Sequence, residues 1–290
     1  MQAILLAAGF GTRLKPYTTL RPKPLFPVQN KPLLHILLQK LRQAGCTRII
    51  VNAHHLATQV AAALEGWEEA ILQYEPEILG TGGSLRCALP KLENAPVLVV
   101  NGDVYQNIDL SSLYRHHLQA VNGVTLALHD FPRFNTVEVK DGLVRSFAGT
   151  GYCLAFTGIQ VVNPEIIAQI PSRGFFHIID LYEQLATHGK INFHRVDGAF
   201  WRDMGTPEDY LLLNKELQNK AGERWLIAGD AQIGKNVRLR GWGCIGPKAV
   251  IAEGCELQDS VVWDGAHIPA NSKEKNAILT GNPMSFAPAR

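Results

Sequence analysis

The chain begins MQAILLAAGFGTRL over residues 1–14, an apolar run that meets two glycines and an arginine. Residues 3–7 are apolar on both faces, which predicts a buried strand in a sheet covered by helices on both sides. Gly9 and Gly11 predict a tight turn at the carboxyl end of that strand, where open α/β sheets bind their ligands. Glycine lets backbone N–H groups approach phosphate oxygens closely, and the Arg13 guanidinium adds positive charge. The stretch therefore predicts a phosphate site at the edge of an α/β sheet.

This turn does not match the two commonest phosphate-binding motifs. Leu14 stands where the dinucleotide-binding pattern G-x-G-x-x-G requires its third glycine, and no G-x-x-x-x-G-K-[ST] is present. The loop that follows holds five prolines between residues 16 and 32. Proline excludes a helix or a central strand there and makes the segment stiff. We therefore expect a rigid loop after the turn.

Strand and helix patterns alternate from this turn to about residue 105. The expected elements are a helix over 33–44, a strand over 48–53, a helix over 56–65, a strand over 70–74, a helix over 83–92 and a strand over 97–103. This alternation predicts an α/β fold with a Rossmann-like, mostly parallel sheet. Residues 123–162 are rich in strand patterns, with a hairpin turn at Asp141-Gly142. Further helices are expected at 110–120, 165–170, 177–188 and 207–220, and a strand at 191–196.

A six-residue period replaces this pattern from about residue 221. Apolar residues recur at Ile233, Leu239, Ile245, Ile251, Leu257 and Trp263. The period is typical of hexapeptide repeats, in which each face of a triangular coil points one apolar side chain inward. We therefore expect an α/β domain over 1–220 and a short left-handed parallel β-helix with a C-terminal tail over 221–290. A glycine-rich tail without repeats is the alternative.

Composition excludes several classes of protein. The net charge is only +2, which gives no case for a general binder of nucleic acid or of a membrane surface. No apolar run approaches the roughly 18 residues that a membrane span needs. Five widely spaced cysteines, none in a C-x-x-C pair, argue against a disulfide framework or a zinc site. They favour a reducing compartment, so we expect a cytoplasmic protein.

Residues 9–31 read GFGTRLKPYTTLRPKPLFPVQNK. This stretch resembles GxGTRLxPxTxxxPKPLxPV, the signature of the sugar-1-phosphate nucleotidyltransferases. The resemblance covers about residues 2–215 and continues through Leu79-Gly80-Thr81-Gly82-Gly83, Asn101-Gly102-Asp103, Phe156-Thr157-Gly158-Ile159 and Trp201-Arg202-Asp203-Met204-Gly205-Thr206. It implies the nucleotide-diphospho-sugar transferase type of sheet. It also implies an enzyme that joins a nucleoside triphosphate to a sugar 1-phosphate and releases pyrophosphate.

The resemblance also implies roles for individual residues. Arg13 and Lys23 would be the catalytic cations. The nucleotide would be bound by Leu6, Ala7, Ala8, Gly9, Gly11, Thr12, Arg13, Glu75, Gly80 and Asp103. The sugar phosphate would be bound by Gly82, Asn101, Thr157, Gly158 and Trp201.

Two aspartates are candidate ligands for Mg²⁺. Asp103 follows directly after an apolar strand, and carboxylate oxygens are ligands that Mg²⁺ prefers. The resemblance adds Asp203, and the pair would hold one Mg²⁺ on the α-phosphate. Taken alone, Asp103 is typical of a turn or a helix N-cap, and Asp203 is typical of a turn, with Thr206 as the N-cap of the next helix and Pro207 as its first residue. The joint occurrence of the motifs favours the metal site.

The identity of the nucleobase in the nucleoside triphosphate depends mainly on one residue, Glu75. The resemblance places Glu75 against the base, and a carboxylate only accepts hydrogen bonds. Guanine offers two donors on one edge, which favours GTP with a mannose-type sugar. UTP or dTTP is the alternative, because the stretch over residues 98–104 also resembles the N-acetylmuramate-1-phosphate uridylyltransferases.

One departure from the family pattern concerns the sugar phosphate. Many members carry a Glu-Lys-Pro whose lysine holds this group, and the corresponding stretch here begins at Arg145 and contains no lysine. Either Arg145 replaces that lysine or the sugar phosphate relies more on the metal. The local positive charge is provided by one loop: Arg13, Lys15, Arg21, Lys23 and Lys31.

Two other functions are alternatives to this enzyme. A non-catalytic regulatory relative would be expected to lack one of Arg13, Lys23, Asp103 and Asp203, and all four are present. An acyltransferase in the β-helix is disfavoured, since only His267 is a candidate base there. The β-helix tail is the surface through which we would expect a homo-oligomer to form.

Overall fold

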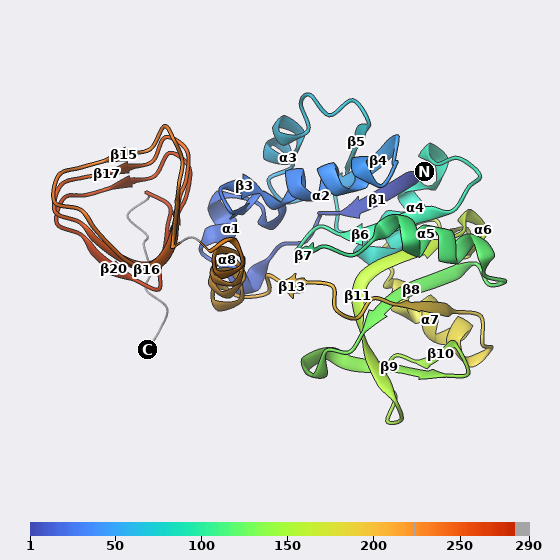
Figure 1. The fold of residues 1–290 in the computed structure, drawn as a ribbon. Helices are drawn as coiled ribbons and strands as arrows, with labels where there is room; N and C mark the ends of the chain where they lie inside the picture. Colours follow the sequence, from blue (N-terminus) through green and yellow to red (C-terminus); the bar gives the residue numbers. More distant parts are fainter. Residues whose placement is uncertain (223, 282–290) are drawn as a thin grey trace. The chain divides into compact units, whose positions relative to one another are not determined.

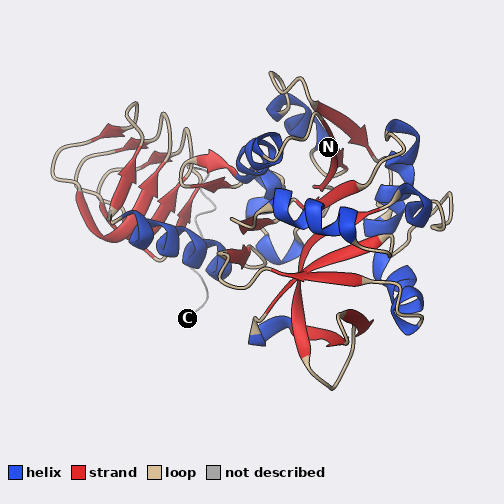
Figure 2. Ribbon diagram, turned by 45° about the vertical axis from the view of Figure 1, so that its right-hand side comes forward, coloured by secondary structure: helices blue, strands red, loops and turns tan. Residues whose placement is uncertain are grey.

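The computed structural model describes residues 1–222 and 224–281, which fall into two compact units. Unit 1 comprises Met1–Phe10 and Leu37–Trp201, and unit 2 comprises Gly11–Ile36 and the chain from Arg202 onward. Figure 1 traces the elements along the sequence and Figure 2 shows their types. The units interleave along the chain, and the predicted division into 1–220 and 221–290 stays a prediction.

Unit 1 is built on a nine-stranded sheet with the order β5-β4-β1-β6-β11-β8-β12-β10-β9 (Figure 1). The half formed by β5, β4, β1 and β6 is parallel, as expected. In the other half β11 runs antiparallel to β6 and β8, so a mostly parallel sheet is wrong and the sheet is mixed. The strands of this sheet are β1 Gln2–Leu6, β4 Arg48–Ala53, β5 Ala70–Tyr74, β6 Val97–Asn101, β8 Val124–His129, β9 Asn135–Lys140, β10 Leu143–Ser146, β11 Cys153–Val162 and β12 Asn192–Arg195. The short strand β7, Val104–Gln106, is not part of it.

Helices bury both faces of this sheet. Val97 and Val99 of β6 belong to the same buried cluster as residues of α4, α6 and α7. Leu98 and Val100 alternate with them, point to the opposite face and are also buried. None of the helices formed by the described residues has the length and apolarity needed to cross a membrane. The helices up to Trp201 are α2 Leu33–Gln43, α3 Ala57–Ala63, α4 Gly80–Ala88, α5 Leu110–Gln119, α6 Pro164–Ile167 and α7 Ile178–Thr187, with 3-10 turns Leu89–Lys91 and Pro132–Phe134.

Local patterns predicted these elements well. The leucines of α2 that recur at helical spacing are all buried: Leu34, Leu37, Leu38 and Leu41. The hairpin turn between β9 and β10 is confirmed, with positive φ at both Asp141 and Gly142, as a primed turn requires. Helix α4 begins at Gly80, three residues earlier than its apolar pattern indicates.

The proline-rich loop of unit 2 is not entirely without helix. It contains a single α-helical turn, α1 Tyr17–Leu20, between Pro16 and Pro22, so the exclusion of a helix was wrong for these four residues. Pro16 occupies the N-cap, where its missing N–H is not needed, and the turn ends before Pro22. The other elements of the loop are 3-10 turns Thr12–Leu14 and Lys23–Leu25 and strands β2 Pro27–Val28 and β3 Lys31–Pro32.

The C-terminal part of unit 2 is a stack of short parallel strands. One sheet has the order β14-β16-β18-β20, with β21 also paired to β18, and a second has the order β15-β17-β19. Helix α8, Pro207–Ala221, precedes the stack and follows β13, Trp201–Asp203. The strands are β14 Trp225–Ile227, β15 Gln232–Ile233, β16 Arg238–Ile245, β17 Val250–Ile251, β18 Glu256–Val262, β19 His267–Ile268, β20 Lys273–Lys275 and β21 Ile278–Leu279.

A change of register in this stack alters the direction of one side chain, that of Trp263, from the expected one. Leu239 pairs with Leu257, eighteen residues on, but Ile245 pairs with Val262, only seventeen residues on. Because neighbouring side chains in a strand alternate in direction, Val262 joins the buried interior and Trp263 turns away from it. The prediction that Trp263 points inward is therefore wrong. Ile233, in the end strand β15, is also 41% exposed.

Candidate active site

A neighbouring strand holds the turn that follows β1. Asn52 of β4 accepts a hydrogen bond through Oδ1 from the backbone N–H of Ala7, at 2.5 Å. Because β1 lies between β4 and β6, the chain changes direction across the sheet at this point. Open α/β sheets bind their ligands beyond the carboxyl ends of the strands at such a switch point. The turn thus has the position that its sequence predicts.

The glycines of the turn leave backbone donors available. Within the described residues, the N–H groups of Gly9 and Gly11 donate no hydrogen bond. Gly11 has a φ of +59°, and a Cβ built there would lie 2.8 Å from Cγ2 of Thr18. Only glycine fits this position without displacing a neighbour. Nucleotide binding by Leu6, Ala7, Ala8, Gly9, Gly11 and Thr12 stays a prediction.

Glu75 carries a buried carboxylate that makes no ion pair with the described residues. It is 1% exposed, and Oε1 accepts hydrogen bonds from Nδ2 of Asn52 at 3.0 Å and Nε2 of Gln73 at 3.1 Å. Oε2 is buried and has no hydrogen-bond partner in the part of the chain that the structure describes. Asn52 therefore links the glycine turn after β1, which is predicted to bind phosphate, to the Glu75 carboxylate, which is predicted to contact the base. Sequence reasoning missed Asn52 and Gln73, although a polar residue in an apolar strand was a signal for both.

The glycines at the start of α4 allow a second segment to approach. A Cβ at Gly80 would lie 2.7 Å from the carbonyl oxygen of Phe176, and a Cβ at Gly82 would lie 2.7 Å from its ring. The N–H groups of Gly82 and Gly83 both donate to that carbonyl, at 2.9 and 3.2 Å. These two donors are thus already used within unit 1. Substrate binding by Gly80 and Gly82 stays a prediction.

The end of β6 packs tightly against β1 and β11. Gly102 donates its N–H to the carbonyl of Leu6 at 2.8 Å, and a Cβ there would lie 2.7 Å from the same oxygen. Asn101 lies against Gly158, where a Cβ would meet Nδ2 of Asn101 at 2.4 Å. Asp103 follows in the turn before β7, at the same sheet edge as the phosphate turn. It caps no helix, since α5 is capped by Asp109.

Thr157 and Trp201 both have their polar groups engaged within unit 1. The Thr157 hydroxyl is fully buried and donates to the carbonyl of Ala127 at 2.8 Å. Trp201 is buried and donates Nε1–H to the carbonyl of Thr157 at 2.9 Å. The Trp201 ring is surrounded by the rings of His129, Phe131 and Phe134. Contact of Thr157, Gly158, Asn101 or Trp201 with a sugar phosphate stays a prediction.

Unit 2 brings together three of the predicted charged residues. Lys23 Nζ lies 3.6 Å from Oδ1 of Asp203, with side chains 8% and 22% exposed. A Cβ built at Gly205 would lie 2.6 Å from Oδ2 of Asp203 and 3.1 Å from both terminal guanidinium nitrogens of Arg13. Because Gly205 has no side chain, the Asp203 carboxylate and the Arg13 guanidinium can both lie close to its backbone. Thr206 then caps α8 by accepting a hydrogen bond from the N–H of Asp209, as its sequence indicates.

The cations of the loop differ in how much charge they leave for a ligand. Arg21 forms two hydrogen bonds to the carboxylate of Asp264, at 2.6 and 2.9 Å, so its charge is neutralised. Arg13 makes no ion pair with the described residues and is exposed. Lys15 and Lys31 are exposed as well. Because Lys23 is paired with Asp203, the cations of this loop without an ion pair among the described residues are Arg13, Lys15 and Lys31.

Arg145 takes part in a hairpin at the other end of the sheet. It lies on β10, and its Nη2 is 3.7 Å from Oδ2 of Asp141. In the sheet order β10 is separated from β6 by β11, β8 and β12. Arg145 therefore stands beside Asp141 and not at the end of β6.

Comparison with known proteins matches residues 2–220 to the family model described as Nucleotidyl transferase. The N-acetylmuramate alpha-1-phosphate uridylyltransferase of Neisseria meningitidis serogroup B is 33% identical, over 77% of this chain and 99% of that protein. The mannose-1-phosphate guanylyltransferase of Mycobacterium tuberculosis is 29% identical, over 93% of this chain and 82% of that protein. Among solved structures, HddC from Yersinia pseudotuberculosis is similar with a TM-score of 0.65 and 26% identity, over 74% of this chain and 99% of that chain.

Proposed function

We propose that this chain, which belongs to the nucleotidyl transferase family, joins a nucleoside triphosphate to a sugar 1-phosphate and releases pyrophosphate. It is accordingly an enzyme, a nucleotidyltransferase. The observation that carries the proposal is the grouping of Arg13, Lys23 and Asp203 in unit 2. Two relatives are named for the transfer of guanylyl and uridylyl groups to sugar 1-phosphates, which supports this substrate class.

The proposed reaction is a displacement at phosphorus. A phosphate oxygen of the sugar 1-phosphate attacks the α-phosphorus, and the bond from that phosphorus to the pyrophosphate oxygen breaks. No covalent enzyme intermediate is needed, so the protein contributes positioning and charge neutralisation. Lys23, which is buried and held next to Asp203, provides a fixed positive charge. Arg13, exposed and without an ion pair among the described residues, is free to follow the triphosphate.

We further propose that Asp103 and Asp203 hold Mg²⁺. The described residues contain no group of three or more His, Cys, Asp or Glu side chains arranged for a metal. A Mg²⁺ bound together with substrate phosphates needs only one or two carboxylates, and oxygen donors suit it. When bound, Mg²⁺ neutralises charge that develops on the phosphate oxygens.

GTP with a mannose-type sugar is the proposed substrate pair. Glu75 supports it, because the buried Oε2 is an acceptor without a partner among the described residues and guanine offers two donors. The alternative is UTP or dTTP, which the uridylyltransferase at 33% identity favours. Each nucleotide can be tested in the same assay.

Glu75→Gln is expected to shift selectivity from GTP toward UTP by about tenfold or more, since a carboxamide presents both a donor and an acceptor. The measurement is kcat/KM for GTP and for UTP at saturating sugar 1-phosphate. Glu77→Gln, an exposed neighbour in the same loop, is the matched control and should leave the ratio unchanged. An unaltered GTP-to-UTP ratio in Glu75→Gln would show that Glu75 does not contact the base.

Release of pyrophosphate tests the proposal directly. GTP, UTP and dTTP are each incubated with a panel of sugar 1-phosphates and Mg²⁺, and we expect pyrophosphate from at least one pair. Thermal shifts with each nucleotide alone narrow the panel, because a ligand of the folded state raises its apparent stability. If the folded protein binds nucleotides and no pair yields pyrophosphate, the non-catalytic alternative replaces this proposal.

The C-terminal strands are proposed to form a left-handed parallel β-helix. Their parallel pairing at intervals of eighteen and seventeen residues supports three six-residue faces per turn. A homo-oligomer formed through this segment is likewise a proposal, to be checked by the mass of the protein in solution. A cytoplasmic location is proposed from the cysteines, all five of which are free thiols.

A further inference from the structure

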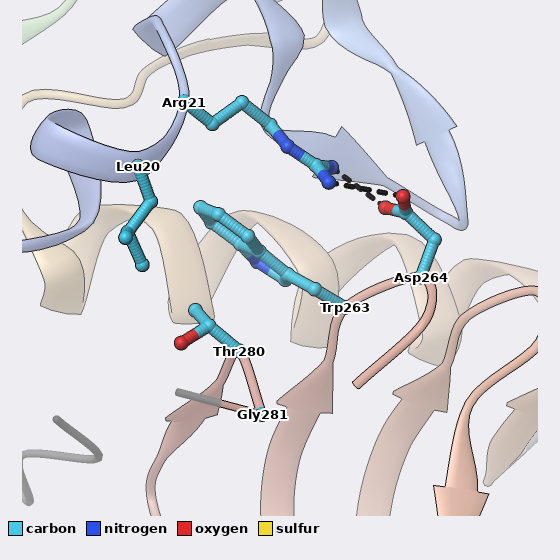
Figure 3. A pocket seen from close by; sticks show the side chains of 6 residues that line it. All are labelled: Leu20, Arg21, Trp263, Asp264, Thr280 and Gly281. Carbon is cyan, nitrogen blue, oxygen red and sulfur yellow. Dashed lines mark hydrogen bonds and ion pairs between the residues drawn. The ribbon is translucent and has the colours of Figure 1, made fainter. Parts of the chain in front are cut away.

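The corner that follows β18 contacts the loop that carries Lys23. We call Trp263 and Asp264 the 263–264 corner. Arg21, two residues before Lys23, forms its paired hydrogen bonds with the Asp264 carboxylate and lies over the Trp263 ring, 4.7 Å from the centroid (Figure 3). The family signature leaves the position of Arg21 open, so the proposed reaction does not explain this residue. Its partners lie more than 240 positions away in the sequence.

The corner holds the loop on both sides of Lys23. Before Lys23, the ring of Tyr17 lies 6.2 Å from that of Trp263. After Lys23, the ring of Phe26 packs edge-on against Trp263 at 4.8 Å. Lys23 is thus bracketed by contacts to a single buried tryptophan.

The same corner also contacts the helix that follows Asp203. Trp263 donates Nε1–H to the hydroxyl of Tyr210 in α8 at 3.3 Å, and that hydroxyl donates to the carbonyl of Pro27 at 2.5 Å. Tyr210 is one turn into α8, whose first residue comes four positions after Asp203. The loop of Lys23 and the helix after Asp203 are therefore packed on one support.

The ion pair at the corner is accessible to solvent. The side chains of Arg21 and Asp264 are 22% and 45% exposed, and a cavity of about 270 Å³ borders them, lined also by Leu20 and Thr280 (Figure 3). Burial acts to raise the pKa of Asp264, but the hydrogen bonds and charge of Arg21 lower it below its ordinary value. Exposed ion pairs of this kind add little to folding stability. A displaced catalytic group, in contrast, costs up to about 100-fold in rate per ångström.

We propose that the 263–264 corner positions Lys23, so that the C-terminal strands take part in setting the turnover rate. The proposal rests on the proposed function of Lys23. Asp264 and Trp263 are positioning residues, because they act on the reaction only through the loop. Loss of the Arg21–Asp264 pair therefore lowers kcat while the protein stays folded and still binds its substrates.

The test compares Asp264→Asn with Glu256→Gln, which breaks ion pairs to Arg238 and Arg240 in the same stack away from the loop. We expect Asp264→Asn to lower kcat about tenfold, with each KM changed less than about twofold and an unchanged melting temperature. Amide hydrogen exchange in residues 17–27 should rise in Asp264→Asn and not in Glu256→Gln. Asp264→Glu, which keeps the carboxylate, should restore most of the lost kcat.

Each outcome decides between the two proposals. If the wild-type protein releases no pyrophosphate, the proposed function fails and the positioning of Lys23 fails with it. If the wild type is active and Asp264→Asn keeps its kcat, or lowers it without faster exchange in residues 17–27, the positioning proposal alone is overturned. A fall in kcat that Glu256→Gln reproduces also overturns it, because the effect would then belong to the stack in general.

Discussion

Lys23→Met is expected to lower kcat by about 10²–10³-fold, the usual cost of removing one fixed charge donor from a transition state. The lysine is buried and held beside Asp203, so its ammonium has little freedom to adjust. Methionine keeps the length and apolar stem of the side chain and removes only the charge. The measurement is single-turnover and steady-state pyrophosphate release at saturating substrates.

Lys31→Met is the matched control for this substitution. Lys31 belongs to the same loop and carries the same charge, but it is exposed. We expect its kcat to stay within about twofold of the wild type, because exposed charges are screened by water and salt. Equal losses in both variants would mean that the loop contributes only diffuse positive charge and that Lys23 has no specific function.

Asp203→Asn and Asp103→Asn are each expected to lower kcat by about 10³-fold. A bound metal contributes several kcal/mol of charge stabilisation, and each 1.36 kcal/mol corresponds to a factor of ten in rate. Asparagine keeps the size of the side chain and removes the anionic oxygen that Mg²⁺ prefers. The activity that remains should require a higher Mg²⁺ concentration, which a titration of pyrophosphate release against Mg²⁺ measures.

Glu208→Gln controls for the loss of a negative charge near Asp203. Glu208 is exposed in the first turn of α8, so its substitution should leave both the rate and the Mg²⁺ dependence unchanged. Near-normal turnover in both Asp103→Asn and Asp203→Asn would remove the metal assignment. Normal turnover in only one of them would reduce the site to a single carboxylate.

Local patterns in the sequence predicted the elements because their causes are local. Helix α2 follows from the spacing of its leucines, and the β9–β10 turn follows from an Asp-Gly pair that tolerates positive φ. The direction of β11 could not be predicted in this way. Its apolar residues allow either direction, and the choice depends on pairing with β6 and β8, which are distant in the sequence.

In the candidate site, too, some residues could be predicted from local motifs and others could not. Its motifs identified Arg13, Lys23 and Asp203, and the structure places these three in one unit. The motifs did not identify Asn52, because its partners Ala7 and Glu75 come from other segments of the chain. A hydrogen bond requires two groups at a set distance and angle, and only the folded backbone brings them there.

The C-terminal segment shows most clearly what the sequence determines and what the tertiary structure adds. By itself the sequence determined that apolar residues recur every six positions, and the structure shows the parallel strands that such a period allows. Only the tertiary structure decided that one turn is a residue shorter, which sends Val262 inward and turns Trp263 toward Tyr17 and Phe26. The physical reason is that side chains alternate along a strand, so a one-residue change in pairing, invisible in the repeat itself, moves a residue to the opposite face.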